Sequence, residues 1–79
     1  MTKIDLMSRK SQYITEVYGI EVKEVEVGHH NDVRLKWGGL NTDKVLFEMS
    51  LSYDSDNEKA EDVLLRAYDQ VINYMSEQR

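Results

Sequence analysis

The segment DSDNEKAED, residues 54–62, holds the densest group of side chains able to do chemistry in this sequence. Its five carboxylic acids are Asp54, Asp56, Glu58, Glu61 and Asp62. Carboxylates at this density can hold a calcium ion, cap a helix, or form an acidic surface that meets a basic partner. The spacing of the residues distinguishes among these three uses.

A calcium loop of the EF-hand type needs glycine at its sixth position and a bidentate glutamate at its twelfth. Counted from Asp54, these two positions are Lys59 and Leu65. Neither residue can play the required part, so the pattern predicts no metal site in this segment.

Helix capping is the simplest interpretation of the segment. Ser55 and Glu58 match the S-x-x-E capping box, directly ahead of an apolar run of helical spacing. Acids near a helix N-terminus stabilise it by about 0.3–1 kcal/mol each, because the helix dipole is positive there. Capping therefore explains most of the segment without any function.

An acidic partner-binding surface is the functional hypothesis for the same residues. A cap needs one or two acids, whereas this segment has five, and Asp69 extends the polar side of the helix beside Asp62. Carboxylates on a rigid helix steer a basic partner and make its binding sensitive to salt. We predict that the five acids form the interface.

His29, His30 and Asp32 raise the question of a second metal site. Adjacent residues in an extended segment point apart, so only one pair of these side chains converges easily. No third strong ligand lies near them in sequence. The pattern favours an ordinary polar loop and no metal.

Catalytic motifs are absent from the sequence. There is no HExxH, no phosphate-binding glycine loop and no Ser-His-Asp spacing signature. We therefore predict no catalytic residues, no cofactor and a function other than that of an enzyme.

Length and composition narrow the class of protein further. Seventy-nine residues form one small domain, 1–79, and the lack of cysteine excludes disulfides and thiolate zinc sites. No apolar run reaches the length of a signal peptide or a membrane span, so we expect a cytoplasmic protein without membrane contact. Ten basic and fifteen acidic residues give a net charge of −5. Nucleic acid is disfavoured as a partner, because its phosphates require a basic surface.

Hydrophobic periodicity and the four glycines divide the chain into five elements. The first helix has Asp5 as its expected N-cap and Gly19 directly after its end. The first strand changes parity between Val22 and Val25, which indicates a bulge. The predicted elements are a helix at about 5–18, strands at about 20–27, 33–37 and 44–53, and a helix at about 56–78.

The last helix is the most strongly patterned element. Its apolar arc spans roughly 200°, wider than the ~100° that one packing surface needs. The excess can cover the first helix as well as the sheet, or it can serve a second subunit. A homodimer through Leu65, Ile72 or Tyr74 is therefore the alternative to a protein partner.

These elements predict an α+β fold of two layers, α-β-β-β-α. The strands form an antiparallel three-stranded meander, with both helices packed on one face. The residues expected to meet the last helix are Val33, Leu35, Trp37, Phe47, Met49 and Leu51. The residues expected to form a charge ladder on the opposite face are Glu24, Glu26, Arg34, Lys36 and Glu48.

This element order resembles the double-stranded-RNA-binding domain over nearly the whole chain. That family places a histidine in the loop between its first two strands, where this sequence has GHHND. It also places a basic cluster at the start of its last helix, where this sequence has SDNEKAED, with Lys59 as its only basic residue. The resemblance implies the architecture but not the binding of RNA.

Two further hypotheses follow from the whole pattern. The first is a small non-enzymatic protein that binds a basic, nucleic-acid-binding site on another protein; phage and mobile-element inhibitors of host enzymes have a similar general form. The alternative from the resemblance is direct nucleic-acid binding through Lys3, Arg9, Lys10, Arg34 and Lys36.

Overall fold

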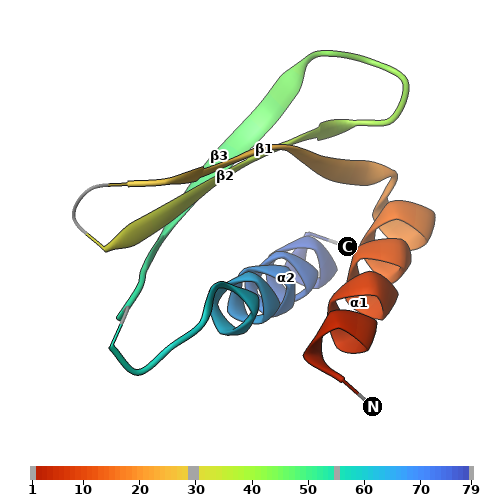
Figure 1. Cartoon of the computed structure of the whole chain (residues 1–79). Helices are drawn as coiled ribbons and strands as arrows, with labels where there is room; N and C mark the ends of the chain where they lie inside the picture. The colour runs from red at the N-terminus through yellow and green to blue at the C-terminus, as the bar shows by residue number, and fades with distance from the viewer. Residues whose placement is uncertain (1, 29–30, 55, 79) are drawn as a thin grey trace.

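The computed structural model describes residues 2–28, 31–54 and 56–78, and it has the predicted α+β order of elements (Figure 1). The elements are α1 (Lys3–Tyr18), β1 (Ile20–Val27), β2 (Asp32–Gly39), β3 (Val45–Ser52) and α2 (Ala60–Glu77). Both helices lie on the same side of the sheet, so the predicted two-layer architecture is confirmed. Neither helix, over these described residues, combines the length and apolarity needed to cross a membrane.

The sheet is an antiparallel meander in the order β1-β2-β3, with β2 in the centre. Val25 lies opposite Leu35, which in turn lies opposite Met49 on β3. The register shifts between Val22 and Glu24, so the bulge predicted in the first strand is present. It returns Val25 to the face of the sheet that carries Leu35.

The two helices run in the same direction beneath the sheet. Lys3 pairs with Asp62 near the start of both helices, and Lys10 pairs with Asp69 two turns later. Because both pairs join the helices at the same offset in sequence, α1 and α2 lie side by side and parallel. The wide apolar arc of α2 is thus shared between α1 and the sheet.

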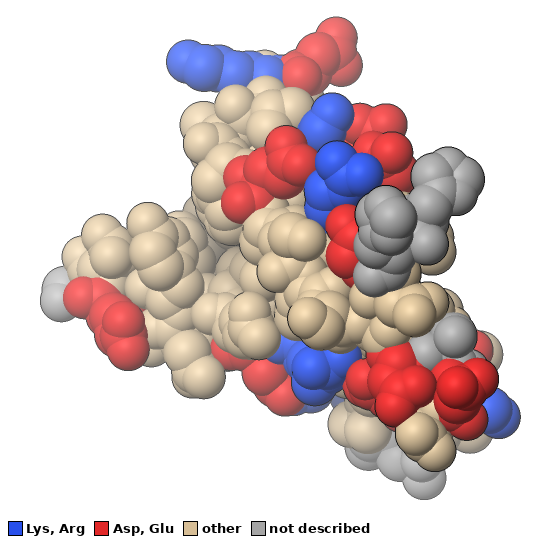
Figure 2. Space-filling view, turned by 90° about the vertical axis from the view of Figure 1, so that its left-hand side faces the viewer, with Lys and Arg blue, Asp and Glu red and all other residues tan. Residues whose placement is uncertain are grey.

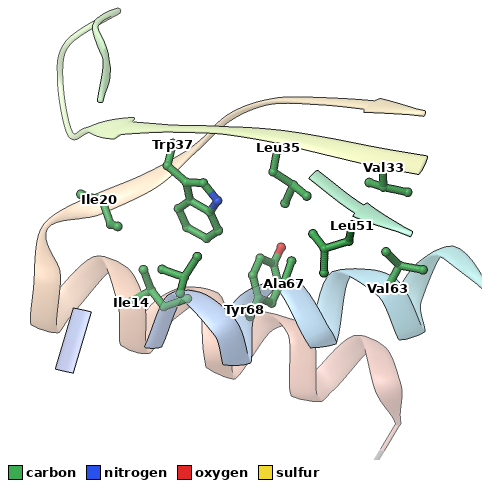
Figure 3. Packing of buried hydrophobic residues seen from close by; sticks show 10 residues of the cluster. Ile14, Ile20, Val33, Leu35, Trp37, Leu51, Val63, Ala67 and Tyr68 are labelled. Carbon is green, nitrogen blue, oxygen red and sulfur yellow. The ribbon is translucent and has the colours of Figure 1, made fainter. Parts of the chain in front are cut away.

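The core fills the space between the sheet and the helices, and the ring of Trp37 points from β2 into that space (Figure 3). Its ring meets Tyr68 of α2 edge-on at 6.0 Å and stacks on Phe47 of β3 at 6.2 Å, measured between ring centroids. Its indole Nε1 donates to the sulfur of Met49 at 3.3 Å. The buried apolar residues are Ile14, Ile20, Val33, Leu35, Trp37, Leu51, Val63, Ala67, Tyr68 and Val71.

Two residues predicted to lie in the core are only half-buried. Phe47 and Met49 pack against the core but keep one side open, because β3 is an edge strand. Val25 and Val27 face the helical layer and are 48% and 64% exposed, so that layer does not cover the end of β1.

The start of α1 corrects the predicted cap. The N-cap is Thr2, whose hydroxyl accepts from the N–H of Asp5 at 3.1 Å, while the carboxylate of Asp5 accepts from the N–H of Thr2 at 3.3 Å. Asp5 is therefore the third helical residue of a reciprocal capping box. Gly19 ends the helix as predicted, with φ +69°.

The start of α2 lies four residues later than predicted. The helix begins at Ala60 with Lys59 as its N-cap, and Asp62 accepts from the backbone N–H of Lys59 at 3.0 Å. Glu58 lies before the helix and not at its third position, so the predicted capping box between Ser55 and Glu58 is wrong. Ser55 itself lies outside the described residues. The acid that caps the helix is Asp62.

The strand limits also differ slightly from those predicted. The second strand extends over Asp32–Gly39 rather than 33–37, and the third covers Val45–Ser52 rather than 44–53. Gly38 lies in β2, where the backbone carbonyl of Lys44 approaches it closely; a Cβ built there would lie 2.2 Å from that oxygen. Only a glycine fits this contact.

Candidate functional site

The five predicted interface acids lie between the end of β3 and the first turn of α2. Asp54, Asp56 and Glu58 lie in the segment that leads from β3 to α2, and Glu61 and Asp62 lie in the first turn of α2 (Figure 1). The structure therefore brings all five to one end of the molecule. Their individual contacts divide them into two groups.

Asp54 organises the turn that follows β3. Its carboxylate accepts from the side-chain amide of Asn57 at 2.8 Å and from the N–H of Asp56 at 3.1 Å. The hydrogen bond from Asn57, followed by that from Asp56, lowers the pKa of Asp54 below its ordinary value. The carbonyl of Asp54 also accepts from the N–H of Glu58 at 2.7 Å. Asp54 thus holds the loop in shape.

Glu58 fastens the loop to α2 and to the sheet. Its carboxylate pairs with the guanidinium of Arg66 at 3.0 Å and accepts from the N–H of Asp54 at 3.3 Å. Arg66 also donates to the backbone carbonyl of Ser52 at 2.8 Å. One guanidinium therefore joins the end of β3, the loop and the helix.

Asp62 joins the two helices at their N-terminal ends. Its carboxylate lies 2.6 Å from the ammonium of Lys3 and accepts the N–H of Lys59. The hydrogen bond from Lys3, with that from Lys59, lowers the pKa of Asp62, and Asp62 in turn raises the pKa of Lys3. Asp69, which we expected to extend the acidic side of α2, pairs instead with Lys10 of α1.

Asp56 and Glu61 differ from the other three acids. Within the part of the chain that the structure describes, neither carboxylate forms a hydrogen bond or an ion pair. Asp56 is exposed at the turn, and Glu61 is half-buried on α2. These two acids remain available to a partner.

Acidic and basic side chains are interspersed over the surface. Figure 2 shows one side of the molecule, on which red and blue groups lie next to one another in several separate places. On the outer face of the sheet, Lys36 pairs with Glu24 at 3.0 Å and Arg34 lies 3.7 Å from Glu26. This arrangement is the expected charge ladder.

The candidate nucleic-acid-binding cations are mostly engaged by acids. Lys3 and Lys10 pair with α2, and Arg34 and Lys36 pair across the sheet. They also belong to two different layers of the fold, so they form no continuous basic stripe of the kind that phosphates require. Arg9 is exposed on α1 and shares no surface with the ladder.

The histidine pair of the predicted polar loop, His29 and His30, lies outside the described residues. Asp32, the acid beside it, lies 3.5 Å from the guanidinium of Arg34. Over residues 2–28, 31–54 and 56–78, no three His, Cys, Asp or Glu side chains come together in a way that could hold a metal ion.

A groove between β3 and α2 was not predicted from the sequence. It encloses about 350 Å³ and is lined by Phe47, Glu48, Met49, Gln70, Val71 and Tyr74. Tyr74 is 54% exposed, and its ring lies 6.0 Å from that of Phe47. The predicted meander places the third strand at an edge, but strand alternation assigned Phe47 and Met49 to the core and does not say how far α2 covers them, so the groove was missed.

The comparison with known proteins identifies no relative. No protein-family model, no curated protein and no solved structure matches this chain.

The residues predicted for a homodimer differ in exposure: Leu65 and Ile72 are half-buried, whereas Tyr74 lines the groove. That dimer stays a prediction.

Proposed function

We propose that the chain is a non-enzymatic protein-binding module whose partner presents a basic surface to the start of α2. The observation that supports this function is the division of the five acids. Asp54, Glu58 and Asp62 hold the loop and the helix end in place, while Asp56 and Glu61 form no hydrogen bond or ion pair among the described residues.

A hydrogen-bonded loop and helix start that carry two unpaired acids are suited to recognition. Because the scaffold is already fixed, a partner does not have to order it on binding, which reduces the entropic cost of association. The acids attract a basic site by long-range electrostatics and give binding a strong dependence on salt. A nucleic-acid-binding groove on another protein has the required charge, and blocking it would make this chain an inhibitor.

The test compares affinity capture from a bacterial lysate by three forms of the full chain. The first is the wild type, and the second carries Asp56→Asn and Glu61→Gln. The matched control carries Asp43→Asn and Glu77→Gln, which remove the same charge at exposed positions away from the loop. Circular dichroism verifies that all three fold.

The wild type and the control should retain one protein that the Asp56/Glu61 variant loses. Raising the salt concentration from about 0.05 to 0.5 M should release that protein, because the shorter Debye length screens the attraction between exposed charges. Equal retention by all three forms would show that the acidic start of α2 is not the interface. Equal loss from both variants would show that only net charge matters.

A further inference from the structure

The outer edge of β3 has backbone groups that are not used inside the sheet. The N–H of Tyr53 donates to the carbonyl of Asn31 at 2.6 Å. In an antiparallel pair, residues alternate between bonding to the neighbouring strand and facing away from it. Following the register from Tyr53, Leu51 and Met49 bond toward β2. The N–H and C=O groups of Ser50 and Glu48, the residues between them, therefore point outward.

The hydrogen bonds between β2 and β1 support the same alternation. The N–H of Gly28 donates to the carbonyl of Asp32 at 2.8 Å, which turns Asp32, and with it Arg34, toward β1. The intervening residues Val33 and Leu35 are thus left to bond β3. The two independent hydrogen bonds agree on which groups of β3 face the open edge.

The open part of the edge is limited at one end. Arg66 donates to the carbonyl of Ser52, the last residue of β3, and so occupies the edge there. Glu48 and Ser50 have no such cover among the described residues. The free edge is therefore a short stretch that ends beside the Arg66–Glu58 pair and the acidic loop.

The groove lies directly beneath this free stretch. An added strand that pairs with Glu48 and Ser50 alternates its side chains between the two faces of the sheet. Those on the helical face enter the groove between Phe47 and Met49 on one side and Tyr74 on the other, which calls for apolar side chains. Those on the outer face lie beside Glu48.

Charge decides between two candidate occupants. Glu48 lies opposite Lys36 of β2, but the ammonium of Lys36 pairs with Glu24, and the carboxylate of Glu48 forms no ion pair within the described residues; no basic residue lines the groove. A second copy of the chain would bring another Glu48 and another net charge of −5 to this edge. Like charges on neighbouring strands are destabilising, whereas an acid opposite a base is favourable. The edge thus fits a strand with basic residues.

We propose that the β3 edge binds an extended segment of a partner protein in which apolar and basic residues alternate, and that this segment becomes a fourth strand of the sheet. Its backbone pairs with Glu48 and Ser50, its apolar side chains fill the groove, and its basic side chains face Glu48. This mode of recognition combines main-chain affinity with side-chain selectivity. The inference rests on the proposed protein-binding function but assigns it a second surface.

The test is selection from a display library of random linear peptides of about ten residues, a length that spans a strand. The bait is the full wild-type chain. Ser50→Pro removes one outward N–H without breaking a bond to β2, because proline is tolerated on the free side of an edge strand. Glu48→Lys reverses the charge of the edge on the solvent face, so the test does not depend on the proline variant folding.

The selected peptides should alternate apolar and basic residues, and they should bind Ser50→Pro roughly tenfold or more weakly than the wild type. Glu48→Lys should lose them and select acidic residues instead. Hydrogen exchange of the amides of Glu48 and Ser50 should slow when a selected peptide is bound. The control with Asp56→Asn and Glu61→Gln should bind these peptides as the wild type does.

Three results would overturn the proposal. The selected peptides could lack the alternation, they could bind Ser50→Pro as tightly as the wild type, or the wild type could enrich no peptide more than Ser50→Pro does. A wild-type dimer that Glu48→Lys or Ser50→Pro dissociates would identify a second copy as the occupant instead. If the peptides fail while lysate capture still depends on Asp56 and Glu61, the acidic surface stands without the edge.

Discussion

The two edges of the sheet are built differently. β1 carries four charged residues among its eight, Glu21, Lys23, Glu24 and Glu26, and it has a bulge. β3 carries one charged residue among its eight, Glu48. Two apolar residues of the same strand, Val45 and Leu46, are 43% and 56% exposed. Charges and bulges on an edge discourage pairing with another strand, and apolar side chains with free backbone groups encourage it.

The difference indicates that this small domain protects one edge and leaves the other open. The ladder on β1 engages its acids with Lys36 and Arg34 of β2, so its charges are already balanced within the sheet. On β3 the carboxylate of Glu48 lies opposite Lys36 but forms no ion pair among the described residues, because Lys36 pairs with Glu24, and the groove beside it exposes Tyr74. The open edge and the acidic loop adjoin at Arg66, which places both proposed contact surfaces on one side of α2.

The largest expected effect comes from Trp37→Ala in the central strand β2, which tests how far the core supports the open side of the sheet. Trp37 is 1% exposed and contacts both Phe47 and Tyr68, so its loss removes the support of β3. We expect the free energy of unfolding to fall by about 3–5 kcal/mol, measured by urea denaturation.

The comparison substitution is Val25→Ala, on the edge strand β1. Val25 lies opposite Leu35 but is 48% exposed, so the free energy of unfolding should change by less than about 0.5 kcal/mol. Similar losses for Trp37→Ala and Val25→Ala would show that the end of β1 is packed as tightly as the centre of the sheet.

The next effect comes from Gly38→Ala, at the point where β2 leads toward β3. An added Cβ would lie 2.2 Å from the carbonyl oxygen of Lys44 and 3.0 Å from the side chain of Lys23. The backbone has to shift, and we expect a loss of about 1–3 kcal/mol in urea denaturation.

Gly39→Ala is the control for Gly38→Ala. Its added Cβ would meet only the methyl group of Thr42, at 3.2 Å, and that side chain can move. If the two alanine variants unfold at the same urea concentration, the close approach of Lys44 to β2 is not what requires glycine.

The contrast between the edges also separates what the sequence predicts from what it does not. Alternation predicted the buried face of β2, because successive side chains of a strand point to opposite sides whatever lies next to it. It did not predict the groove, because the exposure of Phe47 depends on how far α2 covers the edge strand, which alternation does not give. The acids after β3 pointed to a helix start, but they did not reveal that Asp62 also pairs with Lys3, nearly sixty residues away. The roles of Glu58 and Arg66 likewise depend on the distant carbonyl of Ser52.

Acid should weaken the region beside the open edge first. The pKa values of Asp54 and Asp62 are lowered in the folded chain, so their contribution to stability is present above the unfolded pKa of about 3.9 and is lost as the pH falls below it. Asp62→Asn should flatten the fall of the thermal midpoint between about pH 4 and pH 2, measured by circular dichroism. Asp56→Asn, which removes no internal contact, should follow the wild-type curve; the same flattening in both variants would contradict the assignment.

Alkali should weaken the protected edge, β1, instead, and we expect the smallest change in stability there. The hydrogen bond and the charge of Glu24 raise the pKa of Lys36, and the charges of Glu48 and Glu26 add to this. A raised lysine pKa stabilises the fold below the unfolded value of about 10.4, and that contribution is lost as the pH rises through the folded value. Glu24→Gln should therefore flatten the decline of the thermal midpoint above about pH 10, and Glu26→Gln should flatten it less. Because Glu24 belongs to β1 and Glu48 to β3, a larger effect from Glu48→Gln would show that the ladder is centred on the open edge and that Glu48 is not free for a partner.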